Sequence, residues 1–177
     1  MKTALDTFDA ISAKLEVREF IPKKVPDETK RKILEAARLT GSSMNTQHWR
    51  FIVVQDRSNL KRLASDSTSG KWVEWADFAI IILIDPKVPG SNIDSGRVVQ
   101  DMELAAWNFG VGSGIFTGIV EADLRRDYGI PDSLKPAAVL GFGYAKKKLL
   151  GKKKRKPLAE LVFGERYGEK LKAASLP

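Results

Sequence analysis

The chain has 177 residues, of which 43% are hydrophobic and 29% are charged, and this composition is typical of one globular domain with a substantial core. It contains no cysteine and a single histidine, His48, which excludes disulfides, thiolate metal sites, cysteine nucleophiles and multi-histidine metal centres. We therefore predict one domain over residues 1–177, no metal site and no catalytic side chain. Chemistry on such a chain is expected to belong to a bound cofactor.

The net charge of +8 is concentrated in residues 146–156, which hold eight lysines and arginines and no acidic residue. The chain has 30 basic and 22 acidic residues, so removing these eight leaves equal numbers of the two, 22 of each. A nucleic-acid binder usually carries a recognisable module or a broad basic face, so nucleic-acid binding through residues 146–156 is the less favoured alternative. The segment is either a local anion site or a solvated loop.

The first residues of the chain lack the apolar stretch of a signal peptide. The longest apolar run, Phe78 to Ile84, has seven residues, whereas a membrane-spanning helix needs about 20. We expect a cytoplasmic protein that makes no membrane contact.

Apolar residues at helical spacing predict a first helix over residues 3–16, through Leu5, Phe8, Ile11 and Leu15. Further helices are expected from about Pro26 to just before Gly41, over 57–66, over about 93–109 with a glycine stop at 110–112, and over 121–128. Strands are expected at 51–54, at 78–84 in the centre of a sheet, over 114–120 and over 137–143. This order predicts an α+β or three-layer α/β fold, in which helices flank a small sheet. The apolar residues after Pro157 are too few to fold alone, and a partner subunit is one candidate for covering them.

The stretch from Gly41 to Phe51 is dense in hydroxyl and amide side chains and lies between a predicted helix and a predicted strand. Such a loop offers neutral hydrogen-bond partners that suit a polyhydroxylated ligand. Serine and asparagine are also common in ordinary turns, so composition alone favours a plain turn here.

The order of the residues in this stretch changes that interpretation. Ala37 to Phe51 resembles the nitroreductase signature Ala-x-x-Ala-Pro-Ser-Ser-x-Asn-x-Gln-Pro-Trp-x-Phe, although Gly41 and His48 replace its two prolines. Four further blocks resemble the same family in the correct order: Lys14–Phe20, Gln100–Gly114, Pro136–Ala145 and Lys153–Val162. The resemblance covers nearly the whole chain.

The nitroreductase resemblance implies a mostly antiparallel central sheet, an obligate homodimer, and flavin mononucleotide (FMN) bound at the dimer interface. Carried over by position, Lys14, Lys153 and Arg155 would neutralise the FMN phosphate, and Arg18 would lie near the pyrimidine edge of the flavin. Ser42, Ser43, Asn45 and Gln47 would form the loop that bonds the ribityl chain and ring edge, with Asn45 from the opposite subunit as one option. Thr117 and Gly118 would present backbone near flavin N5.

Some residues keep an alternative interpretation. Glu16 stands where the family pattern has serine, so its carboxylate must point away from a phosphate or pair with a lysine. Trp72 and Trp75 are either a lid over the flavin or packing anchors. Arg18 could equally be a surface arginine at a helix end, and Lys146, Lys147, Lys148 and Lys152 are read as a solvated loop.

The resemblance implies an oxidoreductase that passes hydride from NAD(P)H through FMN to a small electron-poor acceptor, such as a nitroaromatic or a quinone. A flavin-binding protein without turnover is the alternative.

Overall fold

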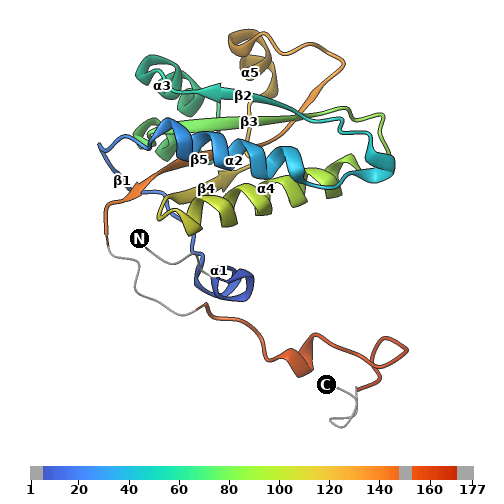
Figure 1. Ribbon diagram of the computed structural model, residues 1–177. Coiled ribbons are helices and arrows are strands. Elements are labelled where there is room, and N and C mark those ends of the chain that lie inside the picture. Colours follow the sequence, from blue (N-terminus) through green and yellow to red (C-terminus); the bar gives the residue numbers. More distant parts are fainter. Residues whose placement is uncertain (1–5, 148–152, 171–177) are drawn as a thin grey trace.

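The computed structural model describes residues 6–147 and 153–170. A five-stranded sheet lies between two layers of helices, and the described residues from 153 onward extend away from this body as a tail (Figure 1). This arrangement confirms the predicted three-layer α+β fold. Within the described residues no helix is both long and apolar enough to span a bilayer.

The sheet consists of β1 (Phe20–Ile21), β2 (Arg50–Val54), β3 (Phe78–Ile84), β4 (Gly112–Phe116) and β5 (Lys135–Ala145). All of these strands pair antiparallel in the order β1-β5-β3-β2, and β4 also pairs with β5. The long strand β5 has β3 along one edge and β4 followed by β1 along the other. β3 is buried along its whole length between β5 and β2, as its apolar run predicted.

The helices are α1 (Thr7–Ala13), α2 (Asp27–Leu39), α3 (Arg57–Ser65), α4 (Ser91–Asn108) and α5 (Glu121–Tyr128). Three short 3-10 turns complete the described elements: η1 (Ser43–Asn45), η2 (Lys71–Trp75) and η3 (Leu158–Glu160). α4 ends as predicted at a glycine, because Gly110 adopts a φ of 73° that favours this residue.

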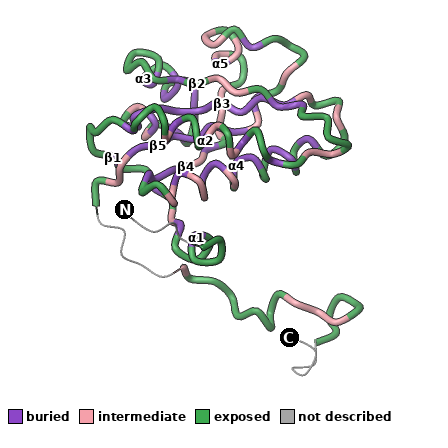
Figure 2. The backbone as a smooth tube through the Cα atoms, viewed as in Figure 1, coloured by how far each residue is buried: buried purple, intermediate pink, exposed green. Residues whose placement is uncertain are grey.

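The two faces of the sheet carry separate hydrophobic clusters because side chains alternate along a strand. Phe78, Ile80 and Ile82 of β3 pack with α2 and α4 on one face. Ala79, Ile81 and Leu83 pack with α3, α5 and η2 on the other. The buried, purple trace of Figure 2 follows most of β3, β4 and β5 and parts of the helices that cover them.

The first helix is shorter than the sequence predicted, and its apolar face is not covered. It ends at Ala13 instead of residue 16, because the backbone of residues 16–18 runs beside β4, where the Val17 amide donates to the Ser113 carbonyl oxygen at 2.8 Å. Phe8 is 76% exposed and Ile11 is 47% exposed. Residues 3–5 of the prediction lie outside the described residues.

The extended piece predicted over 114–120 is also displaced, since β4 occupies Gly112–Phe116. Gly112, which was expected to belong to the glycine stop after the helix, is therefore a strand residue, as is Gly114. A Cβ atom on Gly114 would lie 2.5 Å from the Val17 carbonyl oxygen, and one on Gly112 would lie 2.6 Å from the Val17 side chain. The glycines allow the segment after Lys14 to approach β4 closely.

Candidate functional site

Helix α4 carries two buried carboxylates, and each one gathers some of the predicted site residues. Asp94 lies near its beginning and is 4% exposed, and Glu103 lies near its end and is also 4% exposed. Nine residues of α-helix separate them by roughly 14 Å along the helix axis. The predicted site is therefore divided into two parts in a single chain.

At the Glu103 end, the carboxylate binds the side chain of Lys14. The Lys14 Nζ atom lies 2.8 Å from Glu103 Oε2 and also contacts Glu16 Oε1. The Ser113 hydroxyl donates to Glu103 Oε1 at 3.1 Å. Burial raises the pKa of Glu103, although Lys14 acts in the opposite direction. Lys14 is thus a buried cation with two carboxylate partners.

A cavity of about 570 Å³ opens beside this cluster, and it brings together the three cations that were predicted to bind a phosphate. Lys14 and Glu16 line it from one side, and Lys153 and Arg155 line it from the beginning of the tail. The Lys153 ammonium donates to the Ile11 carbonyl oxygen, which fixes the tail against α1. Three cations face two carboxylates here, so the cavity suits an anionic ligand.

Arg18 lines a neighbouring cavity of about 400 Å³, and Glu16 lines both cavities. The Arg18 guanidinium carbon lies 5.8 Å from the centre of the Trp72 ring. Trp72 packs edge-on against Phe116, and a Cβ atom on Gly141 would come within 2.7 Å of its ring. These contacts favour packing rather than a lid for Trp72, whereas Trp75 is 63% exposed.

Thr117 and Gly118 follow Phe116 directly, at the end of β4. Thr117 is exposed, and the Gly118 carbonyl oxygen accepts from the Thr68 amide at 2.8 Å. A Cβ atom on Gly118 would lie 2.4 Å from the hydroxyl oxygens of Thr68 and Ser69. A side chain at this position would therefore have to displace those two hydroxyl groups.

At the Asp94 end, the carboxylate anchors the loop between α2 and β2. Asp94 Oδ2 accepts from the Ser43 amide at 2.9 Å and lies 3.3 Å from His48 Nε2. The loop also bonds to itself, because the Gln47 amide donates to Ser42 Oγ at 2.9 Å and the Gln47 side chain donates to Asn45 Oδ1 at 3.2 Å. Its side chains from Ser42 to Gln47 are half-buried or exposed.

The backbone of this loop is strained. Met44, Asn45 and Gln47 have φ values of 49°, 54° and 47°, which non-glycine residues seldom adopt. Strain of this kind persists where surrounding contacts hold it, and here the anchor is the buried Asp94. The loop is thus held in one shape that presents hydroxyl and amide groups outward.

Asp94 and Glu103 are the residues that sequence reasoning missed. Glu103 comes four residues after Val99 and three before Ala106, so it occupies the apolar face of α4. A carboxylate on the buried face of a helix was the signal that could have found it, because burying an unpaired charge is costly.

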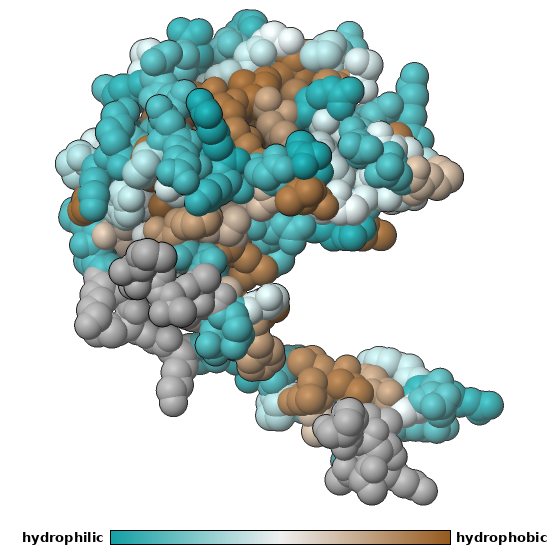
Figure 3. Space-filling view, viewed as in Figure 1, coloured by the Kyte–Doolittle hydropathy of each residue, from teal (hydrophilic) through white to brown (hydrophobic). Residues whose placement is uncertain are grey.

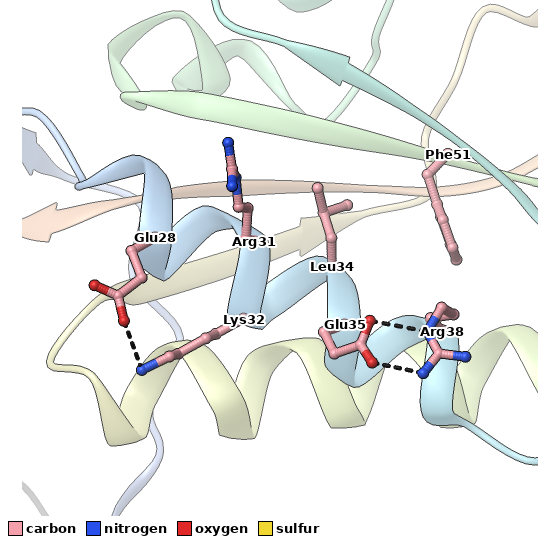
Figure 4. A pocket seen from close by; sticks show the side chains of 7 residues that line it. All are labelled: Glu28, Arg31, Lys32, Leu34, Glu35, Arg38 and Phe51. Carbon is pink, nitrogen blue, oxygen red and sulfur yellow. Dashed lines mark hydrogen bonds and ion pairs between the residues drawn. The ribbon is translucent and has the colours of Figure 1, made fainter.

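A groove of about 650 Å³ between α2 and β2 contains none of the predicted site residues. Leu34 and Phe51 form its apolar part. Four of its charged side chains pair along α2, Glu28 with Lys32 at 3.0 Å and Glu35 with Arg38 at 2.6 Å (Figure 4). The groove lies beside β2, which ends the strand order β1-β5-β3-β2.

Comparisons with known proteins identify the family and the fold of the chain. A model of the nitroreductase family matches residues 16–85 and 85–144. A protein of Methanothermobacter thermautotrophicus, assigned provisionally as an NADH dehydrogenase/NAD(P)H nitroreductase, is 32% identical over 149 residues, which are 79% of this chain and 78% of that protein.

Two solved structures share the fold. A nitroreductase family protein from Clostridium difficile 630 is 26% identical, with a TM-score of 0.83 over 92% of this chain and 99% of that one. An FMN-dependent nitroreductase from Clostridium difficile R20291 has a TM-score of 0.85 over 91% of this chain and 100% of that one, and its 22% identity supports the fold alone. The family match and the archaeal relative show that this chain belongs to the nitroreductase family.

Proposed function

We propose that this protein is an FMN-dependent oxidoreductase that passes hydride from NAD(P)H to an electron-poor small molecule such as a nitroaromatic or a quinone. The observation that carries the proposal is the cavity in which Lys14, Lys153 and Arg155 meet. A phosphate dianion that is partly removed from water in a cavity needs such cationic partners. The family match and the FMN named for one structural neighbour support the same cofactor.

The residues present fit this cofactor in part. The two adjoining cavities, of about 570 and 400 Å³, have volumes within the usual range of small-molecule sites, roughly 300–1,000 Å³. Three cations stand at one end and Arg18 stands in the neighbouring cavity. Glu16, which lines both, is the residue that fits a bound phosphate least well.

The rest of the proposed site comes from a second copy of the chain. Ser42, Ser43, Asn45 and Gln47 lie at the Asp94 end of α4, roughly 14 Å along the helix from Glu103, and this loop lines neither of the two adjoining cavities. The tail has apolar residues that the described chain leaves uncovered, with Leu158 60% and Leu161 57% exposed. Figure 3 shows this apolar surface on the tail in brown. A homodimer would cover it and complete the site.

Bound FMN would supply hydride transfer between NAD(P)H and the acceptor, and Lys14, Lys153 and Arg155 would hold its phosphate. The protein then acts through position and charge. The guanidinium of Arg18 stabilises negative charge on a ligand in its cavity, and the Trp72 ring makes a cation–π contact with that guanidinium. No side-chain nucleophile is needed, and a cytoplasmic location remains our expectation.

The proposal is tested by the absorption spectrum of the purified protein and by mass analysis of the released cofactor. We expect flavin bands and the mass of FMN, and colourless folded protein that binds no added FMN would refute the proposal. Anaerobic mixing with NADH or NADPH then separates the enzyme from a flavin carrier. Bleaching within minutes supports turnover, whereas a stable flavin spectrum supports binding alone.

A pair of variants tests the division of the basic segment. Arg155→Ala removes a cation from the cavity, and we expect FMN to bind about tenfold more weakly. Lys147→Ala removes an equal charge, but Lys147 lines the Arg18 cavity and not the one that holds the phosphate. It pairs there with Glu19 at 3.2 Å, so the change in FMN affinity should be less than about twofold. Titration followed by flavin fluorescence measures both, and equal effects would contradict the assignment.

A further inference from the structure

Two carboxylates share the ammonium group of Lys14, and they differ in how firmly they are held. The side chain of Glu103 is 5% exposed and is fixed by the hydroxyl of Ser113. The side chain of Glu16 is 44% exposed and stands on the wall of the cationic cavity. Its second oxygen accepts from the Ile115 amide at 3.3 Å. The Glu103 carboxylate is therefore held beside Lys14, whereas the Glu16 carboxylate can turn away from Lys14 into solvent.

The position of Glu16 conflicts with an anionic ligand in the cavity. Glu103 alone provides one full negative charge for the one positive charge of Lys14. The carboxylate of Glu16 adds a second negative charge at the same ammonium and faces the space that Lys153 and Arg155 also line. A phosphate placed among these cations meets like charge at close range, which is costly where water is partly excluded.

We propose that Glu16 competes internally with the cofactor phosphate for Lys14, and that it thereby sets how tightly this protein holds FMN. Binding of the phosphate displaces the Glu16 carboxylate toward solvent and releases the Lys14 ammonium and the Ile115 amide as donors. In the absence of the cofactor, Glu16 returns and keeps Lys14 paired. This inference rests on the proposed function, because it assigns a residue that tunes the same site.

The competition predicts a specific signature, since only the phosphate of the cofactor is affected. FMN and riboflavin share the flavin ring and the ribityl chain and differ in the phosphate. Replacing Glu16 by an uncharged residue should strengthen FMN binding and leave riboflavin binding unchanged. A purely structural role for Glu16, as a clip between Lys14 and β4, would affect both ligands in the same direction.

The experiment measures the affinities of wild type, Glu16→Gln and Glu16→Ser for FMN and for riboflavin, by flavin fluorescence after the native cofactor has been removed. Titrations run at pH 8, where the phosphate, with a second pKa near 6, is fully dianionic. We expect both variants to bind FMN about tenfold more tightly, with less than about twofold change for riboflavin. Glu28→Gln is the matched control, because Glu28 pairs with Lys32 on α2, away from the cavity, and its loss changes the net charge equally.

The outcomes separate this inference from the proposed function. If wild type binds FMN and the Glu16 variants bind it no more tightly, Glu16 does not compete and the inference fails alone. It also fails if FMN and riboflavin affinities rise together, or if Glu28→Gln has the same effect as Glu16→Gln. If neither wild type nor variants bind FMN, the proposed function fails and the inference falls with it. Thermal unfolding confirms that each variant is folded.

Discussion

The two ends of α4 use the same chemical group for opposite purposes. At one end, Asp94 accepts from a backbone amide and contacts an imidazole, and so fixes the shape of a neutral, strained loop. At the other, Glu103 binds the Lys14 ammonium, which lines a cavity together with Lys153 and Arg155. A buried carboxylate thus organises geometry at one end and balances charge at the other.

The comparison shows why the two halves of the site have different sensitivities. Loss of Asp94 is expected to disturb shape, and with it the contacts of the whole ligand. Loss of charge balance at the Glu103 end is expected to change two quantities that depend on charge. These are the pH dependence of the free energy of unfolding and the affinity for a phosphate.

The largest effect is expected for Lys14→Met, which leaves Glu103 buried without a counter-charge. We expect a loss of about 3–5 kcal/mol in the free energy of unfolding at pH 8. The loss should be smaller at pH 5. Burial raises the pKa of Glu103 in the folded state above its value in the unfolded state. The contribution of Glu103 to the free energy of unfolding is therefore fully present below the unfolded-state pKa and is lost as the pH rises through the folded-state pKa. Urea unfolding at both pH values measures the difference.

A second substitution checks the cause of that pH dependence. Glu103→Gln in the Lys14→Met background removes the stranded carboxyl group, so the stability difference between pH 5 and pH 8 should shrink toward zero. An equal loss at both pH values in Lys14→Met alone would show that Glu103 is not the group responsible.

An intermediate effect is expected for Asp94→Ala. The substitution leaves the Ser43 amide and His48 without their acceptor, and we expect it to cost about 2–3 kcal/mol of stability. Because the loop is far from the cationic cavity, affinities for FMN and riboflavin should fall by the same factor. Asp94→Asn retains an acceptor oxygen and should lose less. A selective loss of FMN binding would break the distinction between the two ends.

The smallest effect is expected for Arg97→Ala. The Arg97 guanidinium lies 3.6 Å from Asp94 Oδ1, but its side chain is 54% exposed, so solvent screens the pair. We expect a loss below about 1 kcal/mol that disappears in high salt, measured by thermal unfolding. A larger, salt-independent loss would mean that Arg97, and not the buried contacts of Asp94, holds this end of the site.

The layers of the fold were predictable from local patterns. Apolar spacing located α2, α3, α4 and α5 to within about two residues, and the unbroken apolar run of β3 indicated its central position. The end of α1 was not predictable, because it depends on the pairing of Val17 with Ser113, nearly a hundred positions away in the sequence. Gly112 and Gly114 belong to a strand because β4 pairs with β5.

The candidate site was predictable in its residue types but not in its grouping. The family signature pointed to Lys14, Lys153 and Arg155, and the structure places all three around one cavity. The two buried carboxylates, Glu103 and Asp94, were not part of the family motif and lie on the buried face of α4. The separation of the predicted site residues into one group near Asp94 and another near Glu103 depends on the three-dimensional packing of α4.

The triple pairing of β5 has a consequence for motion. β5 keeps β3 on one edge while its other edge is shared by β4 and the two-residue β1. The second edge leads to the residues of the cationic cavity, and its hydrogen bonds can open while the β3–β5 ladder stays closed. In a hydrogen-exchange experiment, amides at β1 and residues 16–18 would exchange well before those that join β3 to β5. That order of exchange would show that the cavity wall loosens without unfolding of the sheet that supports it.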